Sequence, residues 1–291
     1  MTTEAKTLHI FGTNISKSLS PTIHNAAFAH HSLPHTYTIE ECASLSDPRI
    51  QSLLRSSSFG GASVTMPHKL TAFDHCASTS DSANRIGAIN TLIPTSTGIR
   101  GDNTDWSGLY ALITEYEPSS NPNPNPDSES ESKDLVGLVI GAGGAARAAV
   151  YAMLQARFSR VIIANRTLAK AERIIADFAD LESGAEMRAV QGLEGLRASG
   201  LGGDVDVVIG TIPGTVTTEK DFEGLLGKSG GLCVEMAYTP KVTPLMRVVG
   251  KQGWVVRDGL EVLLRQAFVQ YGLWTGRGAP EGVMRGAIGE D

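Results

Sequence analysis

The chain has 291 residues, of which 41% are hydrophobic and 19% are charged, and its formal net charge is -6. This composition is typical of a soluble globular protein with enough residues for two domains of ordinary size. The acidic balance argues against a nucleic-acid-binding protein, whose lysines and arginines gather on one face, and the apolar runs are far too short to span a bilayer.

The N-terminal residues and the cysteines indicate the compartment. Residues 1–8 are polar and lack the apolar core of a signal peptide. Cys42, Cys76 and Cys233 are widely scattered and form no CxxC pair. We therefore expect free thiols, a cytoplasmic location and no metal site, with neither nucleic acid nor membrane as a partner. The sequence leaves open whether the protein is a monomer or a homodimer.

The first 116 residues alternate apolar runs with signals for helix starts. A hydroxyl or carboxylate residue followed by proline begins a helix, and Ser20-Pro21 and Asp47-Pro48 are two such pairs. The pattern predicts strands at 6–12, 36–40, 62–65 and 88–93, and helices at 23–31, 48–55 and 106–116. We take residues 1–116 as an α/β domain, and its dense polar segments, described below, indicate that it is the substrate-binding domain.

Residues 117–133, EPSSNPNPNPDSESESK, interrupt this pattern. Asn-Pro repeats and an acidic Ser-Glu tract contain almost no apolar side chains, so the segment cannot offset the entropy of ordering. We predict a low-complexity linker or extended loop between two domains.

After the linker, strands and helices alternate around glycine turns. The pattern predicts strands at 135–140, 160–164, 205–209 and 232–235, and helices at 145–157 and 168–178. This alternation predicts a Rossmann-like, doubly wound parallel sheet over residues 134–258. Apolar residues then recur at helical spacing from 260 to 274. We expect this helix to pack on the first domain, which residues 259–291 would complete.

A glycine-rich turn follows the first strand of the second domain. Gly141, Gly143, Gly144 and Ala145 stand between the strand at 135–140 and an alanine-rich helix. Glycines let the backbone approach a pyrophosphate, and the start of the helix supplies amide donors and a positive dipole end. The turn therefore predicts a dinucleotide site.

The end of the second strand indicates which dinucleotide binds. An NAD site carries an acidic residue there for the ribose hydroxyls. This chain has Asn165, Arg166 and Thr167 instead, with Lys170 one turn further on. Because a cation at this place pairs with a 2′-phosphate, the sequence favours NADP over NAD.

Polar residues are dense in three segments of the first domain, at 16–21, 63–69 and 90–105. Their hydroxyls and amides suit a small polyhydroxylated acid, and Lys69 could stand near a reacting oxygen. His24 and His68 lie in these segments without a partner at metal-ligand spacing. We expect both histidines to be hydrogen-bonding or capping residues.

Several motifs in the same order resemble the shikimate dehydrogenase family. They are Gly12 with SxSLSPxxHN at 16–25, GASVTMPHK at 61–69, IGAINT at 86–91, GDNTDWxG at 101–108 and GAGGAAR at 141–147. The NRT at 165–167 is similar to that of NADP-using members. The stretches VEMAYTPKVTPL at 234–245 and GLEVLLRQAFVQYGLWTG at 259–276 are similar to the dehydrogenase domain of the fungal pentafunctional arom proteins.

The resemblance implies a function and a role for each matching residue. Lys69 and Asp105 match the catalytic pair of a shikimate dehydrogenase, which reversibly reduces 3-dehydroshikimate to shikimate with NADPH in chorismate and aromatic amino acid biosynthesis. The implied substrate-binding residues are Ser18, Ser20, Thr65, Asn90, Tyr238 and Gln266. The implied cofactor residues are Gly141, Gly143, Gly144, Ala145, Asn165, Arg166, Thr167 and Lys170.

Two other functions stay open. Met66-Pro67-His68 also occurs in relatives that oxidise quinate, so a quinate dehydrogenase or a dual enzyme is the first alternative. Residues 210–213, Gly-Thr-Ile-Pro, replace an Asn-Ala-Thr of many members. A non-catalytic metabolite sensor, as in the fungal quinate-pathway repressors, is the second alternative. It is disfavoured because Lys69 and Asp105 are both present and no DNA-binding region is evident.

Overall fold

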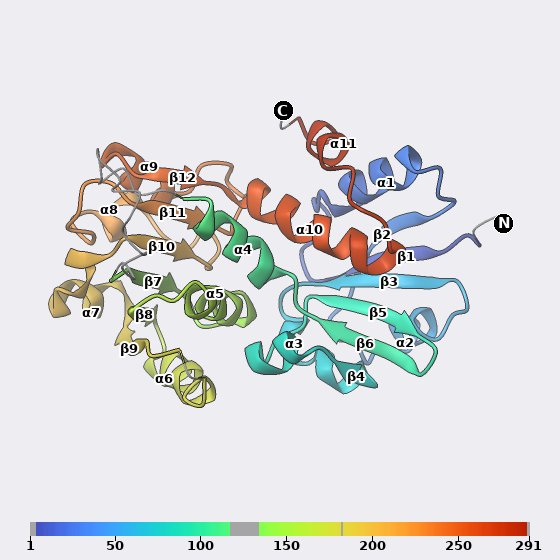
Figure 1. Ribbon diagram of the computed structural model, residues 1–291, viewed down its shortest axis with the longest axis horizontal. Coiled ribbons are helices and arrows are strands. Elements are labelled where there is room, and N and C mark those ends of the chain that lie inside the picture. The colour runs from blue at the N-terminus through green and yellow to red at the C-terminus, as the bar shows by residue number, and fades with distance from the viewer. Residues whose placement is uncertain (1–3, 117–133, 182, 290–291) are drawn as a thin grey trace, which may run out of the picture. The chain divides into compact units, whose positions relative to one another are not determined.

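The computed structural model describes residues 4–116, 134–181 and 183–289. The chain forms two compact units, one of residues 1–107 with 263–291 and one of residues 108–262 (Figure 1). The boundaries fall inside two helices, α4 (Asp105–Thr114) and α10 (Gly259–Thr275), where the sequence had suggested 116 and 259. The predicted linker at 117–133 lies outside the described residues. None of the helices in the described ranges is long and apolar enough to cross a bilayer.

The first unit contains a six-stranded mixed sheet of order β2-β1-β3-β5-β6-β4. β1, β2 and β3 run parallel, and β5 is antiparallel to both β3 and β6. The strands are β1 (Thr7–Gly12), β2 (Thr36–Glu41), β3 (Phe59–Val64), β4 (Ser78–Thr79), β5 (Thr91–Thr95) and β6 (Gly98–Asp102). The helices are α1 (Ser20–His30), α2 (Pro48–Leu54), α3 (Asp81–Ile86), α11 (Glu281–Gly286) and the parts of α4 and α10 in this unit, with short 3₁₀ helices at His68–Leu70 and Ala72–His75.

Alternation along β1 separates two cores in this unit. Leu8 and Ile10 pack with apolar residues of α1, α10 and α11, whereas Phe11 packs with those of α2. Successive side chains of a strand point to opposite faces, so both faces of the sheet are covered by helices. Buried residues of the C-terminal helix α10 are therefore part of the core of the first unit.

The starts of α1 and α2 can be compared with the capping residues that the sequence predicts. The carboxylate of Asp47 accepts a hydrogen bond from the backbone N–H of Arg49 at 2.8 Å, so the predicted cap of α2 is confirmed. α1 differs, since Ser20 is its first helical residue and Leu19 occupies the cap without a side-chain bond. The strand predicted at 88–93 is displaced along the chain, since residues 88–90 are irregular and β5 runs from Thr91 to Thr95.

The second unit contains the predicted parallel sheet, with six strands in the order β12-β11-β10-β7-β8-β9. This is the strand order of dinucleotide-binding sheets. From β7 the chain builds the sheet outward to one edge through β8 and β9, and then returns to β10 on the other side of β7 and builds outward to the opposite edge. The strands are β7 (Val136–Ile140), β8 (Arg160–Asn165), β9 (Glu186–Gln191), β10 (Val207–Gly210), β11 (Leu232–Glu235) and β12 (Val255–Arg257). The helices are α5 (Gly144–Gln155), α6 (Leu168–Asp177), α7 (Gly192–Ser199), α8 (Glu219–Phe222) and α9 (Pro244–Lys251), with a 3₁₀ helix at Leu201–Asp204.

Small residues allow α5 to lie close to β7. Ala146, Ala148 and Ala149 of the helix are fully buried, and a Cβ added at Gly137 of the strand would come within 2.4 Å of the Met153 sulfur. The missing side chain at Gly137 therefore leaves room for the Met153 side chain of the helix. The close packing fixes the turn from β7 into α5, which carries the glycine motif.

Candidate active site

The structure brings Lys69 and Asp105 together, although they are 36 positions apart. Lys69 lies in the 3₁₀ helix that follows β3, and Asp105 begins α4. The Lys69 Nζ lies 2.5 Å from the Asp105 Oδ2, and the side chains are 16% and 7% exposed. The pair is therefore shielded from most solvent, and its charge-assisted hydrogen bond holds the ammonium group in a defined place.

The turn before α4 orients Asp105. The backbone N–H of Asp105 donates to the Asn103 Oδ1 at 3.0 Å, and the Asn103 side-chain amide donates to the Ala88 carbonyl at 2.8 Å. Asp102 accepts instead from the Ser80 hydroxyl at 2.6 Å and from the Arg100 guanidinium at 2.9 Å. Asp102 and Asn103 thus build the turn, and Asp105 alone of the three contacts the lysine.

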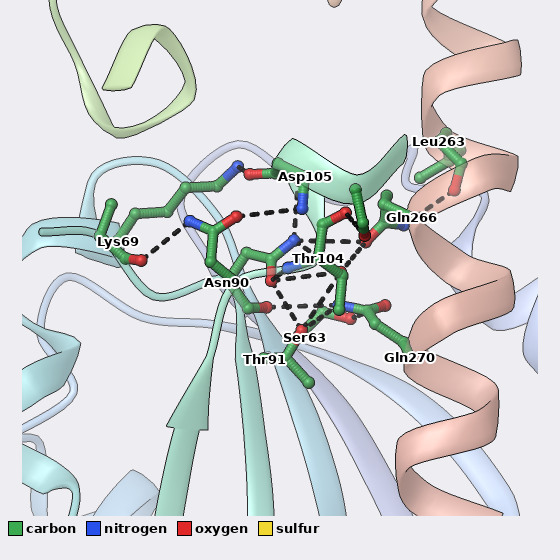
Figure 2. A network of polar contacts seen from close by, with 12 residues as sticks. Ser63, Lys69, Asn90, Thr91, Thr104, Asp105, Leu263, Gln266 and Gln270 are labelled. Atoms are coloured by element: carbon green, nitrogen blue, oxygen red, sulfur yellow. Dashed lines mark hydrogen bonds and ion pairs between the residues drawn. The ribbon is translucent and has the colours of Figure 1, made fainter. Parts of the chain in front are cut away.

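A second group of polar residues lies next to the pair (Figure 2). The Asn90 side-chain amide donates to the Asp105 Oδ1 at 2.8 Å and to the Thr104 hydroxyl at 3.0 Å. The Gln266 Oε1 accepts from the Thr104 hydroxyl at 3.3 Å, and the Gln266 amide donates to the Leu263 carbonyl at 2.8 Å. The structure therefore places two of the residues assigned to substrate binding, Asn90 and Gln266, next to the Lys69–Asp105 pair.

The three hydroxyl residues assigned to substrate binding lie beyond the carboxyl ends of β1 and β3, which are neighbours in the sheet. The Ser18 hydroxyl donates to the Ser20 hydroxyl at 3.3 Å at the start of α1. Thr65 directly follows β3 and donates its backbone N–H to the Phe11 carbonyl at 2.9 Å. Strand ends of this kind are where open α/β sheets bind ligands.

The two histidines of these segments differ from each other. The His68 Nε2 is 2.8 Å from the Cys42 carbonyl, so His68 is a hydrogen-bonding residue as expected. Neither ring nitrogen of His24 has a hydrogen-bond partner at ordinary distance, and its ring stacks on Tyr37 with centroids 4.8 Å apart. The expectation for His24 was wrong, because the residue is packed among aromatic rings. Within the described residues, no group of three or more His, Cys, Asp or Glu side chains is arranged to hold a metal.

The second unit has a cavity of about 870 Å³ at the carboxyl ends of its strands. Three of the residues assigned to the cofactor line it: Gly141 after β7, and Asn165 and Arg166 at the end of β8. The guanidinium-bearing Arg166 is exposed, and no acidic residue ends β8. Such a cavity fits a dinucleotide whose phosphate meets an arginine.

The glycine turn has the conformation that a close ligand requires. Gly141 has a φ of +122°, and a Cβ there would lie 2.3 Å from the Thr211 hydroxyl. A Cβ added at Gly143 would meet no atom within 4 Å, so the space in front of the start of α5 is open. Five assigned cofactor residues do not line the cavity: Gly143, Gly144, Ala145, Thr167 and Lys170.

The sequence analysis missed several residues of this cavity. Residues 191–195, at the end of β9 and the start of α7, line it together with Ile212, Val216 and Asp221. β9 has the sequence EMRAVQ and is an edge strand without buried residues, so it lacks an apolar run. Gly192, which has a φ of +65°, was the available signal for a turn at the end of a strand.

Comparison with known proteins agrees with this geometry. The family model "Shikimate dehydrogenase substrate binding domain" matches residues 10–92, "Shikimate / quinate 5-dehydrogenase" matches 128–209, and "Shikimate 5'-dehydrogenase C-terminal domain" matches 259–288. The solved structure of a shikimate 5-dehydrogenase from Mycobacterium fortuitum is 30% identical, with 99% of each chain covered and a TM-score of 0.78. The chain belongs to the shikimate dehydrogenase family.

Other relatives differ in length. The Pentafunctional AROM polypeptide of Malassezia globosa is 37% identical over 93% of this chain, which spans 16% of that protein. The Quinate repressor protein of Emericella nidulans is 33% identical over 96% of this chain, which spans 34% of it. The structure of a shikimate 5-dehydrogenase from Thermus thermophilus, in complex with NADP(H) and shikimate, is 26% identical, with 97% of this chain and 98% of that chain covered and a TM-score of 0.72.

Tyr238, the remaining residue that the shikimate dehydrogenase pattern assigns to the substrate, is half-buried in the segment between β11 and α9. Glu235 ends β11 just before it and is 3% exposed. The Glu235 carboxylate accepts from the backbone N–H of Ala237 at 3.1 Å and from the Thr243 hydroxyl at 2.8 Å. One buried carboxylate therefore ties both ends of the Tyr238 segment.

Glu235 also explains a departure from the family pattern. Many shikimate dehydrogenases carry asparagine where this chain has Gly210, which pairs with Glu235 across β10 and β11. A Cβ at Gly210 would lie 2.8 Å from the Glu235 Oε1 and 2.9 Å from the Oε2. The carboxylate therefore occupies the space that a side chain at position 210 needs.

Glu235→Gln is expected to stabilise the chain more at neutral than at acidic pH. Burial raises the pKa of Glu235, against the hydrogen bonds that it accepts, so the folded chain holds this proton more tightly than the unfolded chain does. The stability contributed by the protonated carboxyl is present below the ordinary glutamate pKa and is lost as the pH rises through the folded pKa. Between pH 4 and pH 8, the unfolding temperature of the variant should rise relative to that of the wild type by a few degrees.

Glu219→Gln is the matched control. The partly exposed Glu219 bonds to Lys251, and this contact lowers the pKa of Glu219, so the pH dependence of its contribution has the opposite sign. The control should lose stability relative to the wild type as the pH rises. Equal pH dependence in the wild type and Glu235→Gln would contradict the inference that burial disfavours the ionised carboxyl.

Proposed function

We propose that this chain is a shikimate dehydrogenase, which reduces 3-dehydroshikimate reversibly to shikimate with NADPH. The observation that carries the proposal is the shielded Lys69–Asp105 pair, 2.5 Å apart and bonded to Asn90. When a hydride reaches a carbonyl carbon, negative charge grows on the oxygen and must be neutralised by a proton. An ammonium group held by a carboxylate can supply that proton and take it back in the reverse direction.

We assign the other residues to holding the substrate in the first unit. Ser18, Ser20 and Thr65 offer hydroxyls that can donate to or accept from ring hydroxyls. Asn90 and Gln266 present amides beside the pair, and the family resemblance assigns Tyr238 to the substrate carboxylate. The family model for a substrate binding domain, which matches residues 10–92, supports this role for the first unit.

We assign the second unit to NADP, which supplies the hydride when it is bound. The cavity of about 870 Å³ and the open space at Gly143 support a pyrophosphate against the start of α5. Arg166 would bind the 2′-phosphate, with Lys170 nearby on the first turn of α6. The Thermus thermophilus relative in complex with NADP(H) and shikimate supports both ligands. We further infer a cytoplasmic location, a small-molecule substrate and a place in chorismate biosynthesis.

The test is the absorbance of reduced nicotinamide in purified protein. Shikimate and quinate are each supplied with NADP and with NAD, and kcat/KM is measured for the four combinations. Shikimate with NADP should give the highest value. Preference for quinate, or equal use of both acids, would support the alternative of a quinate or dual dehydrogenase instead.

The same measurement tests a metabolite-sensing role. The Quinate repressor protein is a relative over 96% of this chain, so this second candidate has a specific observation behind it. A sensor would bind shikimate or quinate tightly without turnover. The Lys69–Asp105 contact favours the enzyme, because a sensor has no need of a proton-transfer pair.

A further inference from the structure

A continuous row of buried hydrogen bonds leads away from the Lys69–Asp105 pair within the first unit, and Figure 2 shows the part from Asn90 to Ser63. Four of its members have no assigned role in the reaction: Tyr37, Ser63, Thr91 and Gln270. Their exposed fractions are 3%, 7%, 0% and 1%. Burying so many polar side chains without a function or complete hydrogen bonding is costly, so the row calls for an explanation.

All the donors in this row point the same way. The Tyr37 hydroxyl donates to the Ser63 hydroxyl at 2.6 Å, and the Ser63 hydroxyl donates to the Gln270 Oε1 at 2.9 Å. The Gln270 Nε2 donates to the Thr91 hydroxyl at 2.9 Å, and the Thr91 hydroxyl donates to the Asn90 Oδ1 at 2.7 Å. The direction is set at the Gln270 amide, because only its oxygen can accept and only its nitrogen can donate.

The row ends by fixing the side-chain amide of Asn90. The Asn90 Oδ1 accepts from the Thr91 hydroxyl and from the backbone N–H of Thr104, both at 2.7 Å. The Asn90 Nδ2 is therefore the group that faces the Asp105 Oδ1, at 2.8 Å. A reversed amide would turn its oxygen towards the carboxylate, and the repulsion would displace Asp105 and the ammonium group that it holds.

The surroundings of Gln270 keep this arrangement electrically neutral. The ring of His24 lies beside Tyr37, and burial lowers the pKa of His24 to about 3. Burial also raises the pKa of the Tyr37 hydroxyl far above its ordinary value, so the first donor of the row keeps its proton. The row therefore orients the Asp105 carboxylate through hydrogen bonds alone and places no additional charge near it.

We propose that Gln270 is a positioning residue for the proposed reaction, which holds Asn90 and thereby the Lys69–Asp105 pair in place through Thr91. This inference rests on the proposed dehydrogenase function. Gln270 touches neither member of the pair; its amide donates to the Thr91 hydroxyl at 2.9 Å and to the Asn90 backbone carbonyl at 3.3 Å. It lies on α10 one turn after Gln266, the α10 residue assigned to the substrate, so one face of this helix would serve both binding and positioning.

Gln270→Met is expected to lower kcat about tenfold to a hundredfold, because a small displacement of reacting groups has effects of that size. The dissociation constant of NADP should not change, because the second unit is assigned to it. The matched control is Gln51→Met on α2, where the side chain bonds to the Leu45 carbonyl at 2.9 Å and to His75 at 3.1 Å. Both variants should lower the unfolding temperature, and only Gln270→Met should lower the kcat of the folded protein.

Thr91 provides a second test that does not require Gln270→Met to fold. Thr91→Val removes the hydroxyl and should lower kcat, whereas Thr91→Ser keeps it and should stay close to the wild type. The double variant Gln270→Met/Thr91→Val should lose no more than the larger single loss, since both changes break the same row. Equal kcat for Thr91→Val and Thr91→Ser, or a wild-type kcat for Gln270→Met, would overturn the proposal.

A measurement without turnover separates this inference from the proposed function. The NMR signal of the Asn90 side-chain amide can be assigned from its loss in Asn90→Asp. Its chemical shift should change in Gln270→Met and stay constant in Gln51→Met. If the wild type turns over neither acid but the Asn90 signal responds, the proposed function fails and the coupling stands. An unchanged Asn90 signal in Gln270→Met would overturn the coupling.

Discussion

Lys69→Met is expected to lower kcat for shikimate oxidation by about a hundredfold to ten-thousandfold, the usual contribution of a positioned general acid or base. Methionine keeps the length of the side chain but removes the ammonium group that lies 2.5 Å from the Asp105 carboxylate. Asp105→Asn should lower kcat by orders of magnitude as well, because it leaves the ammonium group without its anchor. Initial rates from nicotinamide absorbance give kcat, and equilibrium binding of shikimate and NADP should show that both ligands still bind.

The double variant decides whether the two residues act as a unit. The kcat of the double variant should resemble that of the single variant with the lower kcat, because losses within one catalytic unit are not additive. Lys6→Met is the control, since the Lys6 ammonium bonds to Glu4 at 2.6 Å and to the Ser57 carbonyl at 2.8 Å, outside the polar network. A near wild-type rate in Lys69→Met or in Asp105→Asn would show that the assigned roles are wrong.

Arg166→Ala is expected to weaken NADP binding by about tenfold to a hundredfold while NAD binding changes little. A charge-assisted hydrogen bond contributes about 1.5–3 kcal/mol, and each 1.4 kcal/mol corresponds to about tenfold in affinity. Arg166 lines the cavity of the second unit at the end of β8, where the distinguishing phosphate of NADP is expected. The measurement is KM for each nucleotide at saturating shikimate, together with a direct binding titration.

Arg173→Ala is the matched control, because Arg173 lies on α6, the helix that follows Arg166. Its guanidinium bonds to Asp177 at 2.8 Å and the side chain is 76% exposed, so the nucleotide preference should stay as in the wild type. Equal losses of NADP and NAD use in Arg166→Ala would remove the physical argument for NADP.

The sequence predicted the elements whose signals are local. The strand at 135–140, its glycine turn and the alanine-rich helix each carry their own pattern, and together they predicted the parallel sheet that the second unit contains. β9 was missed because an edge strand with polar residues shows no apolar run. The residues that line the cavity after β9 were missed with it.

The site was predictable only where a chemical group is distinctive. Lys69 and Asp105 carry charge in dense polar motifs, and the structure joins them, whereas their roles stay predictions. Gln270 gave no signal, because a neutral amide on an apolar helix is unremarkable until its partners on other elements are known. Likewise, the glutamine could not be connected to Asp105 from the sequence, since the connection runs through the side chains of Thr91 and Asn90, about 180 positions earlier in the chain.

The contact between Gly210 and Glu235 constrains the order in which these two positions can change. Asparagine at 210, as in many family members, would push the carboxylate away from the Ala237 N–H and the Thr243 hydroxyl that it binds. A shorter residue at 235 must therefore arise first, or in the same step, for a larger residue at 210 to be tolerated. The two positions are therefore expected to be epistatic, so that the effect of a substitution at 210 depends on the residue at 235.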